Sequence, residues 1–80
     1  MPTPEQVREY IERGIACDEL LVEGDGTHFQ ALIVSGAFRG KSRVQRHQLV
    51  YQALGERMRE EVHALSMITL TPEERAAGTP

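Results

Sequence analysis

Three histidines and one cysteine are the side chains of this 80-residue chain best suited to bind a transition metal. Neutral imidazole and thiolate are common ligands of iron and zinc. His28 follows a glycine-rich turn, and His63 follows a long segment with helical periodicity. At a helix end, a histidine can equally serve as a cap that favours the helix dipole, and both roles remain open for His63.

The remaining two candidates have structural explanations. His47 shares a helical face with Val44 and Leu54, so we expect a core histidine that is hydrogen-bonded to the backbone. Cys17 is expected to be a small buried hydrophobic residue. A lone cysteine fits a reducing compartment, and no apolar run or signal-like N-terminus stands out. These features predict a cytoplasmic protein without a membrane segment.

The net charge of −3 is unevenly distributed. Residues 1–35 hold two cations against seven carboxylates, whereas residues 36–63 hold six against three. Four of those cations cluster without an intervening acid: Arg39, Lys41, Arg43 and Arg46. Such a cluster is either a solvated helix face or a surface for an acidic partner or a phosphate backbone, and both interpretations stay open.

No catalytic constellation is present in the sequence. It has no phosphate-binding glycine loop of the Walker type, no H-E-x-x-H motif, and no cysteine–histidine pair with a third orienting group. We therefore expect a protein that is not an enzyme.

The first half of the chain predicts a helix followed by a hairpin. Thr3 can cap a helix that has proline at its first position and ends near Gly14. Residues 20–23 and 28–34 are rich in apolar and β-branched residues and flank the turn Gly24-Asp25-Gly26. The second strand is apolar on both faces near its end, which indicates a central strand.

The second half predicts a long helix, a strand and a short helix. Ser42 can cap a helix reaching about Glu60, followed by a strand at 64–70 and a helix capped by Thr71. The apolar stripe of the long helix is made of Val44, His47, Val50, Tyr51, Leu54 and Met58.

The predicted order α-β-β-α-β-α gives an α+β two-layer sandwich built as a single domain over residues 1–80. A strand–helix–strand connection crosses right-handed, so the third strand should lie parallel to the second in a three-stranded mixed sheet. Helices should cover one sheet face and leave the other more exposed.

Three blocks of sequence carry a resemblance to a known family. Residues 24–29 read G-D-G-T-H-F, residues 38–51 read F-R-G-K-S-R-V-Q-R-H-Q-L-V-Y, and residues 62–66 read V-H-A-L-S. In this order they resemble the BolA family, small proteins that partner monothiol glutaredoxins. The resemblance runs from about Val7 to Glu74, and its specific part is R-H-x-x-V-Y with a later H-A-L.

The resemblance implies a fold like the class II KH domain and a heterodimer with a monothiol glutaredoxin around a bridging 2Fe–2S cluster. The glutaredoxin would supply a cysteine and bound glutathione, and this chain two ligands. His63 matches the family's ligand in H-A-L. The second family ligand comes from the loop between the first two strands, where His28 and Asp25 are the ligand-type side chains. A carboxylate suits a cluster iron poorly, so we predict His28.

The implied role is delivery or assembly of iron–sulfur clusters, or iron sensing. BolA-like proteins are also linked to transcriptional control. The alternative function is therefore a KH-like nucleic-acid-binding transcriptional regulator that uses Arg39, Lys41, Arg43 and Arg46. The isolated chain is expected to hold no cluster and to be a monomer or a weak homodimer.

Overall fold

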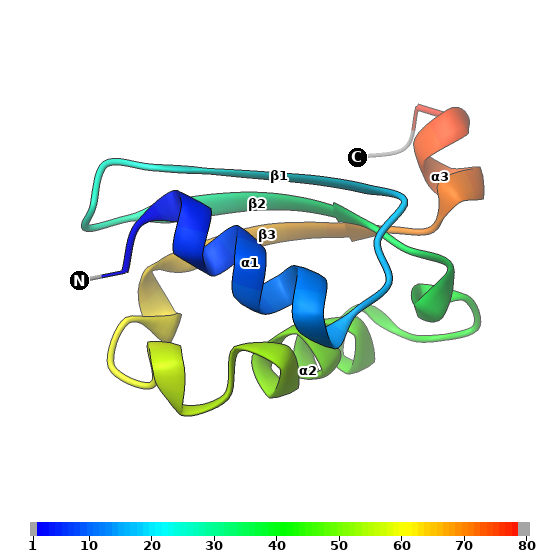
Figure 1. Ribbon diagram of the computed structural model, residues 1–80. Coiled ribbons are helices and arrows are strands. Elements are labelled where there is room, and N and C mark those ends of the chain that lie inside the picture. Colours follow the sequence, from blue (N-terminus) through cyan, green and yellow to red (C-terminus); the bar gives the residue numbers. More distant parts are fainter. Residues whose placement is uncertain (1, 79–80) are drawn as a thin grey trace.

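A three-stranded sheet forms one layer of the molecule, and helices α1 and α2 form the other (Figure 1). The computed structural model describes residues 2–78, with the backbone alone for Val62. The main elements are α1 Pro4–Gly14, β1 Glu19–Gly24, β2 Phe29–Val34, α2 Arg43–Leu54, β3 Leu65–Leu70 and α3 Pro72–Ala76. Three short 3-10 helices lie between them: η1 Gly36–Phe38, η2 Gly55–Met58 and η3 Val62–Ala64. This confirms the predicted α+β sandwich.

The sheet has the order β1-β2-β3, so β2 is the central strand as predicted. β1 and β2 are antiparallel, with Glu19 opposite Val34. β2 and β3 are parallel, with Phe29 opposite Leu65, which confirms the predicted orientation of the third strand. Because parallel strands start at the same edge, the segments that lead into β2 and β3 meet at one end of the sheet.

Each α-helix begins with the same capping device. Thr3, Ser42 and Thr71 each accept a hydrogen bond from the backbone three residues on, and the side chain found there returns one to the cap backbone. These reciprocal bonds satisfy backbone N–H groups that would otherwise lack a partner. None of the helices in residues 2–78 is both long and apolar enough to cross a membrane.

The core lies between the helices and the inner face of the sheet. Its fully buried members include Val7, Ile11, Phe29, Ile33, Phe38, Val50, Leu54 and Met58. α1 approaches α2 closely at Gly14, where an added Cβ would lie 2.5 Å from the Cβ of Ala53. That distance is far below ordinary contact, so the helix crossing requires a glycine at this position.

The predicted long helix is shorter than expected, and its predicted apolar stripe is wrong in part. α2 ends at Leu54 instead of Glu60, because Gly55 adopts a φ of +58° and turns the chain out of the helix. Met58 still reaches the core from η2. Val50 and Leu54 define the buried face, and Tyr51, about 100° further around the helix, is 41% exposed.

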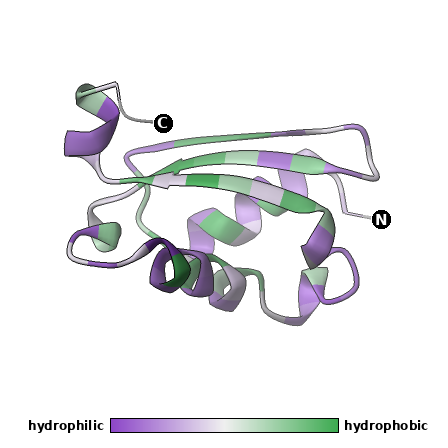
Figure 2. Cartoon of the chain, turned by 180° about the vertical axis from the view of Figure 1, so that it is seen from behind, coloured by the Kyte–Doolittle hydropathy of each residue, from purple (hydrophilic) through white to green (hydrophobic). Residues whose placement is uncertain are grey.

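The outer face of the sheet is left open by the helices (Figure 2). Leu21, Leu32 and Ile68 are register partners across the three strands, and they form one apolar row on this face. Leu21 is 54% exposed and Ile68 is 47% exposed. The expectation of one covered and one more exposed face is therefore confirmed.

Candidate functional site

The parallel pairing of β2 with β3 brings two of the three histidines to the same end of the sheet. Phe29 and Leu65 are the first paired residues of the two strands. His28 immediately precedes Phe29, and His63 lies two residues before Leu65. Both side chains are exposed. In Figure 1 the hairpin turn and the yellow segment before β3 lie at the same end of the molecule.

A tight turn between β1 and β2 positions His28. The carboxylate Oδ1 of Asp25 accepts hydrogen bonds from the backbone N–H of Thr27 and of His28, both at 2.9 Å, and from the Thr27 hydroxyl. The N–H of Asp25 donates to the His28 carbonyl at 3.2 Å. Gly26, with a φ of +96°, allows the chain to reverse. The backbone that carries His28 is therefore well fixed.

These contacts distinguish the two ligand-type side chains of the loop. The hydrogen bonds from His28 and Thr27 hold the pKa of Asp25 far below its usual range. Its carboxylate is thus engaged in building the turn. The imidazole Nδ1 of His28 lies 3.3 Å from the Thr27 hydroxyl, and its other ring nitrogen, Nε2, faces no hydrogen-bonding partner among residues 2–78. The choice of His28 over Asp25 as a ligand stays a prediction.

His63 lies on η3, directly before β3. The alternative that it caps the long helix is wrong, because α2 has already ended at Leu54. A backbone hydrogen bond of 2.9 Å from the N–H of Ala64 to the carbonyl of Glu61 closes the turn that carries it. His63 is exposed, so its imidazole is accessible to a partner.

Two imidazoles at one end of the sheet do not complete a metal centre. Within residues 2–78, no three histidine, cysteine or acidic side chains gather closely enough to hold a metal ion. His28 and His63 are thus two potential donors and not a complete set of ligands within the described residues.

Cys17 lies at the opposite end of the sheet. It precedes β1, whose first residue pairs with the last residue of β2. The thiol is half-buried against the core and lies 3.4 Å from the carbonyl of Ile15. Burial is the main cause that raises its pKa. This matches the expected structural role, although the burial is only partial.

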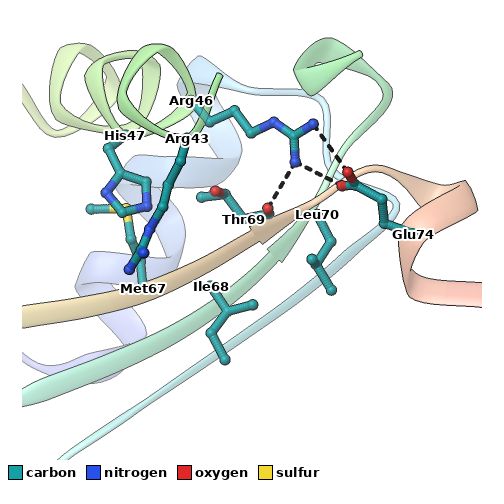
Figure 3. Close-up of a pocket in the computed structure, with 8 residues that line it drawn as sticks. All are labelled: Arg43, Arg46, His47, Met67, Ile68, Thr69, Leu70 and Glu74. Carbon is teal, nitrogen blue, oxygen red and sulfur yellow. Dashed lines mark hydrogen bonds and ion pairs between the residues drawn. The ribbon is translucent and has the colours of Figure 1, made fainter. Parts of the chain in front are cut away.

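The basic segment, which is residues 39–46 with their four cations, also lies at that opposite end of the sheet. α3 contacts two of the four cations, Arg39 and Arg46. Arg39 makes two hydrogen bonds to the carboxylate of Glu73, at 2.9 and 2.7 Å. Arg46 makes two to Glu74, at 2.7 and 3.3 Å, and one to the carbonyl of Thr69 at 3.1 Å (Figure 3). Lys41 and Arg43 are exposed and form no ion pair within the described part of the chain.

A pocket of about 370 Å³ lies between the first turns of α2, the edge of β3 and the start of α3. Arg43 and His47 extend side by side into it from α2 (Figure 3). The buried Nε2 of His47 has no hydrogen-bond partner among residues 2–78, so the predicted bond to the backbone is wrong. Burial is the main cause that lowers the pKa of His47, and the nearby Arg43 adds to it.

The ion pairs of α3 were not foreseen from the sequence. Glu73, Glu74 and Arg75 are consecutive, and each binds a different part of the fold. The third pair joins Arg75 to Glu19, 56 residues earlier, at 2.9 Å. Three charges in a row signal an exposed turn of helix, but nothing local identifies partners so distant.

Comparisons with known proteins point to one family. A family model described as BolA-like protein matches residues 12–74. The chain is 45% identical over 51 residues to the DNA-binding transcriptional regulator BolA of Haemophilus influenzae, covering 64% of this chain and 50% of that protein. It is 50% identical over 48 residues to SufE-like protein 1, chloroplastic/mitochondrial, of Arabidopsis thaliana, covering 60% of this chain and 13% of that protein. The chain thus spans half or less of these relatives.

A solved structure extends the likeness to the whole fold. The structure of a bolA protein homologue from Coxiella burnetii superposes with a TM-score of 0.82 at 40% sequence identity. The superposition covers 95% of this chain and 99% of the Coxiella burnetii chain.

Proposed function

The chain belongs to the BolA-like family, and on that basis we propose that it forms a heterodimer with a monothiol glutaredoxin and shares a bridging 2Fe–2S cluster with it. In this proposal it is a partner protein with no catalytic activity of its own. Its role is in delivery or assembly of iron–sulfur clusters, or in iron sensing. The likeness to a SufE-like protein supports an iron–sulfur role.

The observation that carries the proposal is that His28 and His63 lie at the same end of the sheet. They come from segments more than thirty residues apart, and the parallel pairing of β2 with β3 brings these segments to that end. Both imidazoles are exposed, so a second protein can reach them. A site for a shared cluster needs this combination of paired soft donors and open access.

In the proposed complex, the two histidines bind one iron, and a cysteine and glutathione from the glutaredoxin side bind the other. Histidine pairs are known to replace two cysteines on one iron of a 2Fe–2S cluster. When bound, the cluster supplies electron-transfer chemistry or is itself the cargo. The chain's own part is to orient the two imidazoles: the Asp25 turn fixes His28, and η3 places His63.

A reconstitution experiment tests this function. The parent and His63→Ala proteins are each mixed with a monothiol glutaredoxin, glutathione, iron and sulfide, and visible absorption and circular dichroism are recorded. The parent should shift the cluster spectrum away from that of the glutaredoxin alone. His63→Ala should abolish that shift, and His28→Ala should weaken or abolish it, because each removes a ligand.

The matched control is His47→Gln, which changes a histidine near the other end of β3. It should leave the shifted spectrum in place. Size-exclusion chromatography separates loss of the cluster from loss of the heterodimer. A shifted spectrum that persists in the His63→Ala protein would show that this residue is not a ligand.

We propose DNA binding as a second function, at the other end of the molecule. The observation that favours it is that Lys41 and Arg43 are exposed, lack ion-pair partners among the described residues, and precede or begin α2. Cations at a helix N-terminus oppose the helix dipole, and a bound phosphate offsets that repulsion. A similar protein is named a DNA-binding transcriptional regulator.

A titration with a short DNA duplex tests the second function. Lys41→Gln with Arg43→Gln should weaken binding and make it less sensitive to salt, because fewer phosphates are neutralised. The control removes two cations elsewhere, with Arg57→Gln and Arg59→Gln on and next to η2. If the parent binds no DNA at low salt, or if both variants bind equally, the basic segment is not a DNA surface.

A further inference from the structure

Three consecutive residues of α3 hold it to the body of the protein. Glu73 binds Arg39, Glu74 binds Arg46, and Arg75 binds Glu19. Each pair has two hydrogen bonds between an arginine and a carboxylate. The partners lie in the loop after η1, on α2 and on β1, respectively.

Little else fastens this helix. α3 is five residues long and contains no buried residue. In the outer pair, the side chains of Arg39 and Glu73 are 57% and 65% exposed. Ion pairs at such exposed positions contribute only about 0–1 kcal/mol each and weaken with salt. The outer pair, Arg39 with Glu73, can therefore open at small cost, whereas the pair of Arg46 with Glu74 is better shielded from solvent.

The two α3 carboxylates contact two of the four cations of the basic segment, Arg39 and Arg46. An arginine binds a carboxylate and a phosphate through the same planar pair of N–H groups. From this geometry we propose that Glu73 and Glu74 act as an internal competitor, which holds Arg39 and Arg46 until the phosphates of a nucleic acid displace these two carboxylates. This inference rests on the second proposed function.

The two pairs differ in how far they can open. Arg46 is only 13% exposed and also binds the carbonyls of Lys41 and Thr69, so it stays in place when Glu74 leaves. The guanidinium of Arg39 has no other hydrogen bond within residues 2–78, so release of Glu73 frees it completely. Nucleic acid should therefore gain one full phosphate contact at Arg39 and a partial one at Arg46.

The test compares two double variants with the same net charge. Glu73→Gln with Glu74→Gln removes the competitor, and Glu23→Gln with Glu60→Gln removes two exposed carboxylates that have no ion pair in the described chain. Binding to a short DNA duplex is measured by fluorescence anisotropy between about 50 and about 200 mM salt.

The competitor variant should bind DNA more tightly than both the parent and the control. Its advantage over the parent should be largest at the lowest salt and should shrink as salt rises, because salt already weakens the competing ion pairs in the parent. The control should keep the parent's salt dependence, because it leaves both competing carboxylates in place. Glu73→Gln alone should give the larger share of the change, because it frees Arg39 completely and leaves the Arg46 contacts intact. It replaces the double variant if that protein folds poorly.

Two other outcomes would overturn the competitor role. If both double variants tighten binding equally with the parent's salt dependence, the effect is that of net charge, and the competitor role is overturned while DNA binding stands. If neither the parent nor either variant binds DNA, the second proposed function fails and the competitor role fails with it.

Discussion

At the scale of single residues, the three histidines illustrate three different environments. His28 is fixed by a turn, His63 is exposed on η3, and His47 faces a pocket with one nitrogen buried. The sequence shows all three as isolated histidines, and the family resemblance alone marks His63. The missing hydrogen bond of His47 could not be predicted, because it depends on how α2 is rotated against β3.

His47 should make the stability of the protein dependent on pH. Its pKa is lowered in the folded state, chiefly by burial, so the unfolded chain takes up a proton more readily. His47 therefore leaves the free energy of unfolding unchanged well above its pKa in the unfolded chain, about 6.5. It lowers that free energy as the pH drops below this value. His47→Gln should reduce this fall, as measured by urea unfolding at about pH 7.5 and about pH 5.5. Equal losses in parent and variant would contradict the assignment.

At the scale of elements, the helix crossing at Gly14 is the tightest constraint on the core. A Cβ at this position would lie 2.5 Å from the Cβ and 2.9 Å from the Cα of Ala53.

Gly14→Ala should thus destabilise the protein by about 1–3 kcal/mol, because the helices must separate. Adding Ala53→Gly should recover only part of that loss, because the backbone at position 53 still crowds the new methyl group. Chemical denaturation of the four proteins in the double-mutant cycle measures the coupling. Independent effects would mean that the helices do not meet there.

The elements themselves were largely predictable, because their signals are local. The caps at Thr3 and Thr71, the turn at Asp25 and the central position of β2 follow from short patterns. The end of α2 was missed because periodicity continues through Gly55, while the positive φ of that glycine depends on the chain geometry beyond it. The α3 ion pairs were missed because their partners lie 28 to 56 residues away.

At the scale of the whole molecule, the two proposed functions occupy opposite ends of one sheet. His28 and His63 lie where β2 and β3 begin, whereas the basic segment follows the end of β2. In these proposals, a glutaredoxin and DNA would therefore use different side chains and would not compete for them. The open face with Leu21 and Ile68 lies between these ends and belongs to neither site.

The hydrogen bond from Arg46 to the carbonyl of Thr69 has a consequence for how copies of the protein meet. β3 is an edge strand, and its outward backbone groups would otherwise offer a template for a fourth strand from a neighbouring chain. The guanidinium already occupies one carbonyl on that edge, 3.1 Å away, and brings a positive charge that an incoming strand would have to bury. Arg46 thus blocks one pairing position on the β3 edge and disfavours the addition of a strand from a neighbouring chain there.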